Sequence, residues 1–413
     1  MKNNFFKVLT SEITRLDNAQ SSKRQEVVIS GFTKKTTTAA PMAIVKGKKY
    51  QVFNSNDYLG LRHDERLKKA EHAASQKYGT GPGAVRFISG SLQVHKDLEK
   101  ALAKFHGRDD AMIFSSAFAA NLGVLFSLIK GQSKESLLQS RALVISDELN
   151  HRSIIDGIRL ANLASEEKAI FKHMDATDLD RVLKENLGKF ERCLVVSDGI
   201  FSMLGEYQDL KALAKVIAKY DTKYLQGVLL VVDDAHGVAA CGKTGRGVEE
   251  LSGQQADVLI GTLGKAWGAD GGYVAADQVV IDYLREAGAT YIYSNNISPG
   301  TAGAALAAVK LMSSASGQKI LANLQKNIAF FKQEIKKTKF TLAAKSDHPI
   351  QPVLIGDAKK AKELKLKLFA KNVLVTNINY PVVPQGRDEI RVQISAVHTK
   401  QDIKRFVERL LTY

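Results

Sequence analysis

The sequence predicts an α/β protein with a large, mostly parallel sheet and a smaller α+β domain after it. Between residues 51 and 300, short runs of Val, Ile and Leu alternate with segments of helical periodicity. Continuous apolar runs are typical of parallel strands that are buried on both faces. After residue 300, a long helical stretch leads into two strand-like segments and a final helix. We therefore expect a helical arm (1–50), a large α/β domain (51–300) and a small α+β domain (301–413).

The elements follow in this order along the chain. The start, MKNNFFKVLTSEITRLDNAQ, has apolar residues at helical spacing, so we expect an amphipathic helix, followed by a short polar segment that is a candidate hairpin. The stretch 130–141 is expected to be a loop or short-helix elaboration. The predicted strands of the large domain are AMIFSS (111–116), ALVIS (142–146), RCLVVSD (192–198), GVLLVVDD (227–234), DVLIGTL (257–263) and GGYVAA (271–276). The segments PIQPVLIG and EIRVQISA are strand candidates in the small domain.

Composition favours a soluble globular protein of the cytoplasm. Of the 413 residues, 45% are hydrophobic and 25% charged. No run of about 18 apolar residues indicates a membrane span, and the start lacks the pattern of a signal peptide. Cys193 and Cys241 show no metal-ligand spacing, so we expect no metal site and a reducing compartment.

The net charge of +16 first suggests a nucleic-acid-binding protein. The lysines, however, are spread over most of the chain, and KKAKELKLKLFAK repeats at helical spacing, which indicates a solvated helix face. We therefore expect no nucleic-acid partner. A basic surface also suits anionic small substrates such as phosphates and coenzyme A.

Two charged residues follow predicted strands, at the edge where open α/β sheets bind ligands. Asp233 ends a buried strand, where a carboxylate is costly unless it is paired. It either caps a helix or pairs with a ligand that carries a protonated ring nitrogen, and the spacing leaves both alternatives open. Lys265 lies in IGTLGKAWGADGGY, between small residues. Desolvation there lowers the pKa of the amine and makes it a nucleophile, while the glycines allow a planar group to approach closely.

Other strand ends carry further candidates. AMIFSS runs into AFAANLG, a strand-to-helix junction of small residues that predicts an anion cradle. His151 follows ALVISDELN, where an imidazole either stacks on a flat ring or is an ordinary satisfied histidine. Asp198 and Ser202 follow RCLVVS, and Thr262 lies where its hydroxyl could donate to a phosphate.

These motifs together resemble the α-oxoamine synthases. The similar segments are SNDYLGL (55–61), RFISG (86–90), HKDLE (95–99), NHRSIIDG (150–157), SDGIFSMLG (197–205), Asp-x-x-His (233–236), GTLGK (261–265) and IRVQISAVHT (390–399). They occur in the order of the family and cover the chain from about residue 50 to its end. The resemblance implies the aspartate aminotransferase fold (fold type I), pyridoxal 5′-phosphate as cofactor, and condensation of an amino acid with an acyl-coenzyme A. It also implies a homodimer whose subunits share the active site.

The resemblance also implies a role for each matching residue. Lys265 would hold the cofactor covalently and act as acid and base at the substrate α-carbon, and Asp233 would pair with the ring nitrogen. His236, aided by Ser202, would bind the ring oxygen and, when protonated, is a candidate donor to the thioester. The remaining expected residues are His151 on the ring face; Asp198 in the cofactor site; Ala117, Phe118 and Thr262 at the phosphate; Ser294 and Asn295 reaching the neighbour's phosphate; and Asn56 and Arg391 at the substrate carboxylate.

Within the family, AVRFISG and YPVVPQG resemble the glycine C-acetyltransferases, which use glycine and acetyl-CoA. TGPGAV (80–85) departs from that pattern and leaves the acyl chain open. The alternatives are an 8-amino-7-oxononanoate synthase, which uses alanine and pimeloyl-CoA, and a sphingoid-type enzyme, which uses serine and palmitoyl-CoA.

Overall fold

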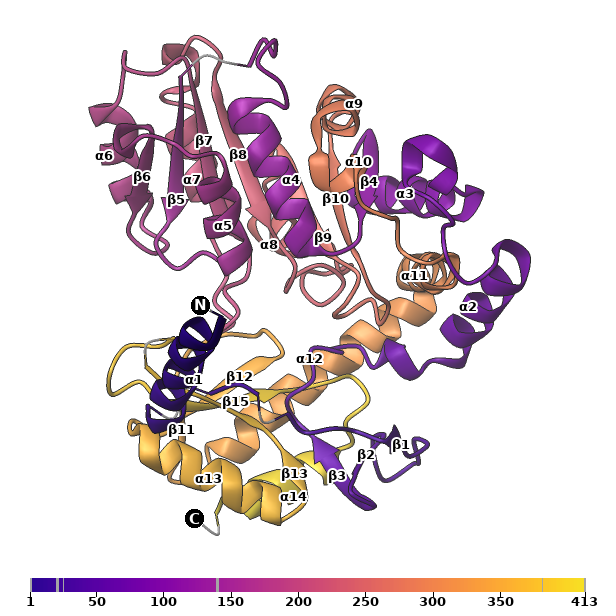
Figure 1. Ribbon diagram of the computed structural model, residues 1–413. Helices are drawn as coiled ribbons and strands as arrows, with labels where there is room; N and C mark the ends of the chain where they lie inside the picture. Colours follow the sequence, from indigo (N-terminus) through magenta and orange to yellow (C-terminus); the bar gives the residue numbers. More distant parts are fainter. Residues whose placement is uncertain (1, 20–21, 25, 139–140, 381, 412–413) are drawn as a thin grey trace.

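The computed structural model describes residues 2–19, 22–24, 26–138, 141–380 and 382–411, and a seven-stranded sheet forms its centre (Figure 1). The strand order is β4-β10-β9-β8-β7-β5-β6, and β10 runs antiparallel to both of its neighbours. The strands are β4 (Asp110–Phe114), β5 (Ala142–Asp147), β6 (Lys168–Phe171), β7 (Arg192–Asp198), β8 (Val228–Asp233), β9 (Val258–Thr262) and β10 (Gly272–Ala276). All six strands predicted for this region are therefore present.

Strand β6 was not predicted from the sequence. It pairs only with β5, at the edge of the sheet, and its residues Lys168 and Ile170 are exposed. An edge strand needs no long apolar run, and the three apolar residues of KAIF are too short a run to mark a strand as the inner strands are marked.

Helices cover both faces of the central sheet, which explains why its strands are apolar throughout. Along β7, Cys193 and Val195 belong to one core cluster, whereas Leu194 and Val196 belong to the other. The first cluster includes side chains of α3 (Gln93–His106), α6 (Ala176–Glu185), α7 (Leu210–Ile217) and α11 (Pro299–Met312). The second includes side chains of α4 (Ala117–Lys130), α5 (Arg152–Leu160) and α9 (Gln278–Ala287).

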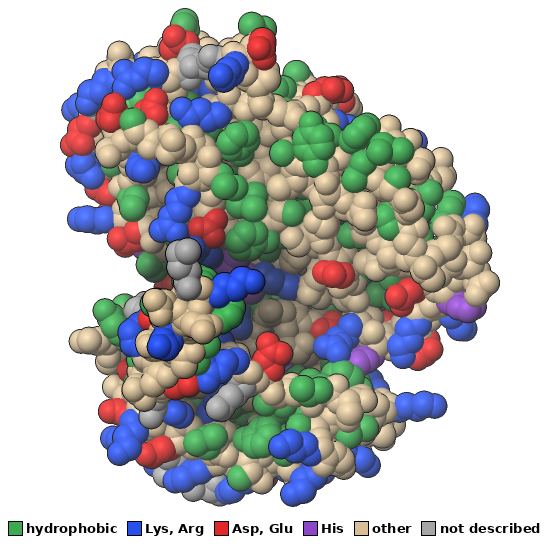
Figure 2. Space-filling model, in the orientation of Figure 1, with side chains coloured by type: hydrophobic (Ala, Val, Ile, Leu, Met, Phe, Trp, Pro, Cys, Tyr) green, Lys and Arg blue, Asp and Glu red, His purple; other side chains and the backbone are tan. Residues whose placement is uncertain are grey.

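A smaller α+β unit follows the long helix α12 (Ala315–Ile335), as the sequence predicts. Its sheet has the order β11-β12-β15-β14. These strands are β11 (Thr341–Leu342), β12 (Ile350–Leu354), β14 (Thr376–Ile378) and β15 (Glu389–Gln393), and the helices beside them are α13 (Ala358–Ala370) and α14 (Lys400–Leu410). Figure 2 shows a hollow between this unit and the part built on the central sheet, with basic side chains along it.

The amino-terminal segment joins the small unit. It begins with the expected helix, α1 (Lys2–Asn18), which buries none of its residues. Strands β1 (Gly31–Phe32), β2 (Ala43–Val45) and β3 (Lys48–Val52) follow, and β3 pairs in parallel with β13 (Val373–Leu374). The predicted hairpin is therefore part of a sheet that includes a strand from the other end of the chain.

The remaining elements are short, apart from α2 (Glu65–Tyr78). They are η1 (Leu61–His63), η2 (Arg86–Gly90), η3 (Ser165–Glu167), η4 (Asp221–Lys223), α8 (Val248–Ser252) and α10 (Ala289–Ile292). The predicted loop at 130–141 consists of turns after the end of α4, with residues 139–140 outside the described part. In the part of the chain that the structure describes, no helix is long and apolar enough to cross a bilayer.

Asp402, in the first turn of α14, links the amino-terminal segment to the small unit. Its buried carboxylate accepts hydrogen bonds from the Ala40 N–H at 2.9 Å, the Gln51 amide at 3.2 Å and Thr399. We expect Asp402→Ala to lower the free energy of unfolding by about 2–4 kcal/mol, because it leaves buried donors without an acceptor. Glu408→Ala, on the exposed side of the same helix, should change it by less than about 0.5 kcal/mol. Equal effects of the two substitutions in urea unfolding would contradict this role.

Candidate active site

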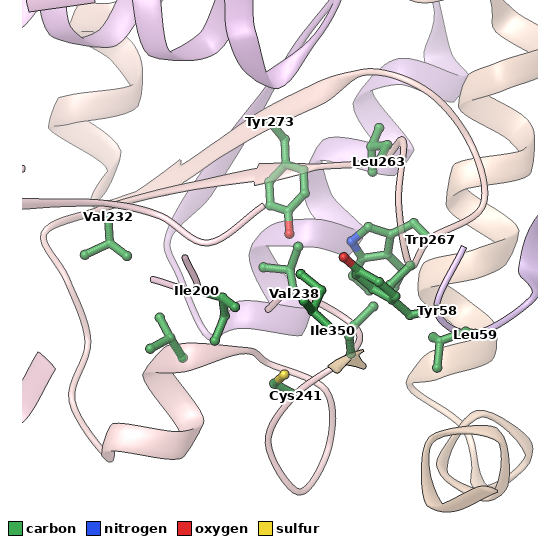
Figure 3. Close-up of a cluster of buried hydrophobic side chains, with 14 of the residues drawn as sticks. Tyr58, Leu59, Ile200, Val232, Val238, Cys241, Leu263, Trp267, Tyr273 and Ile350 are labelled. Carbon is green, nitrogen blue, oxygen red and sulfur yellow. The ribbon is translucent and has the colours of Figure 1, made fainter. Parts of the chain in front are cut away.

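Lys265 lies in the loop after β9, and buried side chains on both sides fix that loop. Leu263 and Trp267, two residues before and after it, are fully buried in the core cluster shown in Figure 3. Trp267 packs edge-on against Phe105, with ring centroids 5.0 Å apart. The Gly268 N–H donates to the Lys265 carbonyl at 3.0 Å, which closes the turn. The backbone of Lys265 is therefore anchored to the core.

The Lys265 side chain lines a cavity at the carboxyl ends of β7, β8 and β9. The cavity is lined by Ala117, Phe118, His151, Ser153, Asp198, Ile200, Ser202, Asp233, Ala235, His236 and Lys265. All of these except Ser153, Ile200 and Ala235 are residues that the sequence predicted. The central sheet brings them together because the ends of its parallel strands meet at one edge.

Burial changes the charge state of the groups in this cavity. It lowers the pKa of Lys265 to about 8, against the opposing charges of Asp233 and Asp198. Burial, together with the negative charge of Asp233, raises the pKa of Asp198 well above its usual range. The amine of Lys265 is therefore partly neutral near neutral pH, and a neutral amine is the form that attacks a carbonyl.

Asp233 is held by hydrogen bonds from neutral groups. Asn121 Nδ2 donates to one carboxylate oxygen at 2.6 Å, and the Ala235 N–H donates to the other at 2.9 Å. The residues after Asp233 form turns and not a helix, so the helix-cap alternative does not occur. Within the described residues, no Lys, Arg or His nitrogen forms an ion pair with this carboxylate. The site therefore fits a ligand with a cationic ring nitrogen.

His151 faces the same cavity. Its Nδ1 lies 2.7 Å from the hydroxyl of Ser153, which also accepts from Asn121 at 3.0 Å. The backbone N–H of His151 donates to a carboxylate oxygen of Asp198 at 3.0 Å. Burial lowers the pKa of His151, so the ring is neutral. The two alternatives for His151, an ordinary satisfied histidine and a ring that stacks on a flat ligand, are compatible. Ser153 satisfies one ring nitrogen, and the ring still lines the cavity.

The amino-terminal end of α4 lies where the sequence predicts an anion cradle. Ser116 caps the helix by accepting from the Ala119 N–H at 3.1 Å. Ala117 and Phe118 line the cavity, and among the described residues no acceptor pairs with their N–H groups. At Gly272 a Cβ atom would lie 2.3 Å from the Ala117 nitrogen, so glycine is what permits this close approach. Free N–H groups at a helix start fit a phosphate group.

The hydroxyl of Thr262 holds its own loop in this structure, and its contact with a phosphate stays a prediction. Its hydroxyl donates to the Gly271 carbonyl at 3.1 Å and accepts from the Gly264 N–H at 3.2 Å. Thr262 is the buried last residue of β9, and its hydroxyl is used to hold the following loop. Ser294 and Asn295 also lie outside the lining of this chain's own cavity.

The role of a protonated His236 stays a prediction, which the burial of the ring disfavours. Burial lowers the pKa of His236 well below its usual range, and the charges of Lys265 and Arg391 act in the same direction. The Tyr58 hydroxyl lies 2.8 Å from His236 Nδ1, and His348 Nε2 lies 2.9 Å from the His236 carbonyl. His236 is therefore a neutral, firmly held hydrogen-bonding group.

Arg391 and Asn56 approach the site from the small unit. Arg391 Nε donates to the Ser202 carbonyl at 2.7 Å, next to the cavity lining. Asn56 contacts the amide of Gln393 at 2.5 Å and lines a second hollow, here called the outer cleft. The outer cleft has a volume of about 410 Å³ and is lined by residues 54–57, Arg62, Gly264, Lys265, Gly268 and Ala269. Lys265 therefore borders both the cavity and the outer cleft.

Sequence reasoning missed several supporting residues. Asn121 and Tyr58 lie inside motifs that were recognised, AFAANLG and SNDYLGL, so their position was a usable signal. His173 gave no such signal, because its partners are distant in the sequence. Burial opposes its charge, but Asp147 at 3.0 Å and Glu206 at 3.5 Å raise the pKa of His173 to about 9. This cluster holds the loop that carries Ile200 and Ser202.

The chain is similar to known proteins over most of its length. Residues 48–410 match the family model of aminotransferase class I and II. An 8-amino-7-oxononanoate synthase of Fervidobacterium nodosum is 38% identical over 391 residues, 94% of each chain. A structure of serine palmitoyltransferase from S. paucimobilis with bound PLP and myriocin has a TM-score of 0.85 at 27% identity, covering 99% of this chain and 97% of that one. An 8-amino-7-oxononanoate synthase structure from Francisella tularensis has a TM-score of 0.71 at 27% identity, covering 88% and 97%. These similarities confirm the predicted fold class and cofactor.

The rate of covalent pyridoxal phosphate uptake by the cofactor-free protein should rise with pH, with a midpoint at about 8. Uptake requires the neutral amine of Lys265, whose pKa is lowered to about 8, so the reactive form predominates above that pH. An exposed lysine would give a midpoint at about 10.4. Borohydride trapping and peptide mass spectrometry between about pH 6 and pH 10 measure this rate. Lys265→Ala should abolish the labelled peptide, and Lys211→Ala, at an exposed position of α7, should leave the midpoint unchanged. A midpoint near that of an exposed lysine would contradict the assignment.

Proposed function

Since the chain belongs to the α-oxoamine synthases, pyridoxal-phosphate-dependent acyltransferases of the aminotransferase class I and II family, we propose that it condenses alanine with a dicarboxylic acyl-coenzyme A, as in 8-amino-7-oxononanoate synthesis. The observation that carries this proposal is the set of relatives of that name, 37–38% identical over most of the chain. They support the stated alternative over the narrower sequence prediction of glycine C-acetyltransferase. The serine palmitoyltransferase structures are 26–28% identical and the 8-amino-7-oxononanoate synthase structure is 27% identical, so the solved structures do not separate the two activities.

In the proposed reaction, the α-carbon of alanine forms a bond to the acyl carbon of the thioester. The carbon–sulfur bond breaks and coenzyme A leaves as the free thiol. The alanine carboxyl group leaves as carbon dioxide. When bound, pyridoxal phosphate supplies an electron-withdrawing ring for an attached amino acid.

The residues of this chain act on protons and charges around that group. Lys265 takes the proton from the substrate α-carbon, a task for which a pKa of about 8 is suitable. Asp233 supplies the negative charge that keeps a ring nitrogen protonated. Arg391, whose Nε is already held by the Ser202 carbonyl, presents the rest of its guanidinium to the amino-acid carboxylate.

A substrate matrix tests the proposal. Holoenzyme is incubated with alanine, glycine or serine, each combined with pimeloyl-, acetyl- or palmitoyl-CoA, and thiol release and product mass are measured. We expect alanine with pimeloyl-CoA to have the highest kcat/KM, by at least about 10-fold. Lys265→Ala should lower its kcat by about 1,000-fold or more. The highest value for glycine with acetyl-CoA would instead identify a glycine C-acetyltransferase, and no thiol release with any pair would refute the proposal.

We also propose a homodimer with shared active sites. Phe87, Ile88 and Tyr293 are exposed large apolar side chains (67%, 68% and 66%), and the rings of Phe87 and Tyr293 lie 6.5 Å apart. Tyr293 precedes Ser294 and Asn295, the two residues expected at the neighbour's phosphate. An exposed apolar patch next to unassigned site residues fits an interface between two copies.

Mixed dimers test whether the Ser294 loop acts on the neighbouring site. Buried Arg86 holds this loop by donating to the Tyr291 carbonyl at 2.7 Å and the Ser294 carbonyl at 3.1 Å. Arg86→Gln and Lys265→Ala homodimers should both be nearly inactive. Co-refolding them in equal amounts should restore about a quarter of the wild-type activity, because half of the dimers then contain one intact site. No recovery, or a monomer in sedimentation, would contradict the shared site.

A further inference from the structure

The outer cleft is the second space that opens onto Lys265, and it is polar. The segment Asn54–Asp57 lines one side, and the backbone of Gly264 and Gly268 lines much of the other. Its volume of about 410 Å³ lies within the usual range for small-ligand sites. Because the cavity beside Asp233 fits the cofactor, the outer cleft is the space open to the substrates that must reach Lys265, and Asn56 in its wall is the residue expected at the amino-acid carboxylate.

The lining of this cleft disfavours a long apolar chain. Asn54, Ser55 and Asn56 present amide and hydroxyl groups, Asp57 adds a carboxylate, and Ala269 is the one apolar side chain in the lining apart from the glycine positions. A palmitoyl chain would remove these polar groups from water without giving them hydrogen bonds, which is costly. The cleft therefore suits a short acyl chain with a polar end.

Arg62 supplies a positive charge to this cleft. Its guanidinium carbon lies 4.4 Å from the centroid of the Phe32 ring, so the side chain is held by a cation–π contact. Within the described residues, no carboxylate comes within 4.0 Å of the guanidinium, although Arg62 donates from its backbone N–H to Asp57 at 3.5 Å. Burial and the charge of Arg62 lower the pKa of neighbouring His63 to about 4, so that ring adds no second charge.

The backbone beneath Arg62 is fixed by close packing. At Gly268, whose φ is +70°, a Cβ atom would lie 2.4 Å from the Arg62 nitrogen. The backbone that carries the Arg62 side chain is therefore packed directly against the lysine loop.

We propose that the Arg62 guanidinium binds the distal carboxylate of the acyl chain, so that the outer cleft selects a dicarboxylic acyl-coenzyme A. A guanidinium can grip a carboxylate with two parallel hydrogen bonds. Among the described residues no carboxylate lies within 4.0 Å of the Arg62 guanidinium, although the nearby Asp57 carboxylate offsets part of its charge. The inference rests on the proposed function, because it assumes that an acyl-coenzyme A is the second substrate.

The test compares pimeloyl-CoA with heptanoyl-CoA, which has the same chain length but lacks the distal carboxylate. The measured quantity is the ratio of their kcat/KM values with alanine and holoenzyme. Arg62→Gln should lower this ratio by about 10- to 100-fold, mainly through the KM for pimeloyl-CoA. Arg62→Lys, which keeps the charge, should give an intermediate ratio. Arg66→Gln should keep the wild-type ratio, because Arg66 is an exposed arginine that pairs with Asp64 outside the cleft.

Two results would overturn the inference. An unchanged ratio in Arg62→Gln means that Arg62 does not contact the acyl chain. An equal loss for both thioesters means that it binds the coenzyme part. If wild-type enzyme releases no thiol with any thioester, the proposed function is refuted, and the role of Arg62 needs its own test. That test is calorimetric binding of pimeloyl-CoA and heptanoyl-CoA to wild-type and Arg62→Gln holoenzyme without amino acid, which shows whether Arg62 distinguishes the two thioesters.

Discussion

Two carboxylates lie side by side at the centre of this molecule, and the rest of the site depends on them. The register of the parallel strands β7 and β8 pairs Asp198 directly with Asp233, and both side chains are buried. Like charges so close raise the free energy of the charged forms unless cations or donors compensate. The neighbouring elements supply part of that compensation: Asn121 from α4, the His151 backbone N–H at the start of α5, and the Lys265 amine after β9. The pKa of Asp198 nevertheless stays well above its usual range, because burial and the charge of Asp233 outweigh these contacts. Backbone pairing in the sheet thus determines where a cationic ligand can bind.

The sequence predicted the parts of this arrangement that depend on local pattern. Apolar runs identified the inner strands, and the residues directly after them included Lys265, Asp233 and His151. The sequence says less where long-range packing decides. The hydroxyl of Thr262 is used by its own loop, and burial against Tyr58 and His348 disfavours a protonated His236. The edge strand β6 has an apolar run of only three residues. His173 could not be found from the sequence because Asp147 and Glu206 meet it only in the folded chain.

The two spaces around Lys265 differ in what they require of the chain. The inner cavity needs a fixed set of charges and N–H groups around one cofactor, and its residues come from the ends of several strands and the start of α4. The outer cleft is built from one continuous segment, Asn54–Arg62, facing a glycine-containing loop. That segment follows β3, which pairs with β13. One wall of the outer cleft is therefore attached to the sheet β1-β2-β3-β13, and the other wall is the lysine loop.

The contact between Gly268 and the backbone of Arg62 has an evolutionary consequence. It restricts position 268 to glycine by shape alone, whatever substrate is used. Position 62 is restricted only in its main chain, and its side chain is exposed. Under the proposed role of Arg62, the side chain at position 62 is therefore the part of this contact that can change the acyl donor without altering the lysine loop.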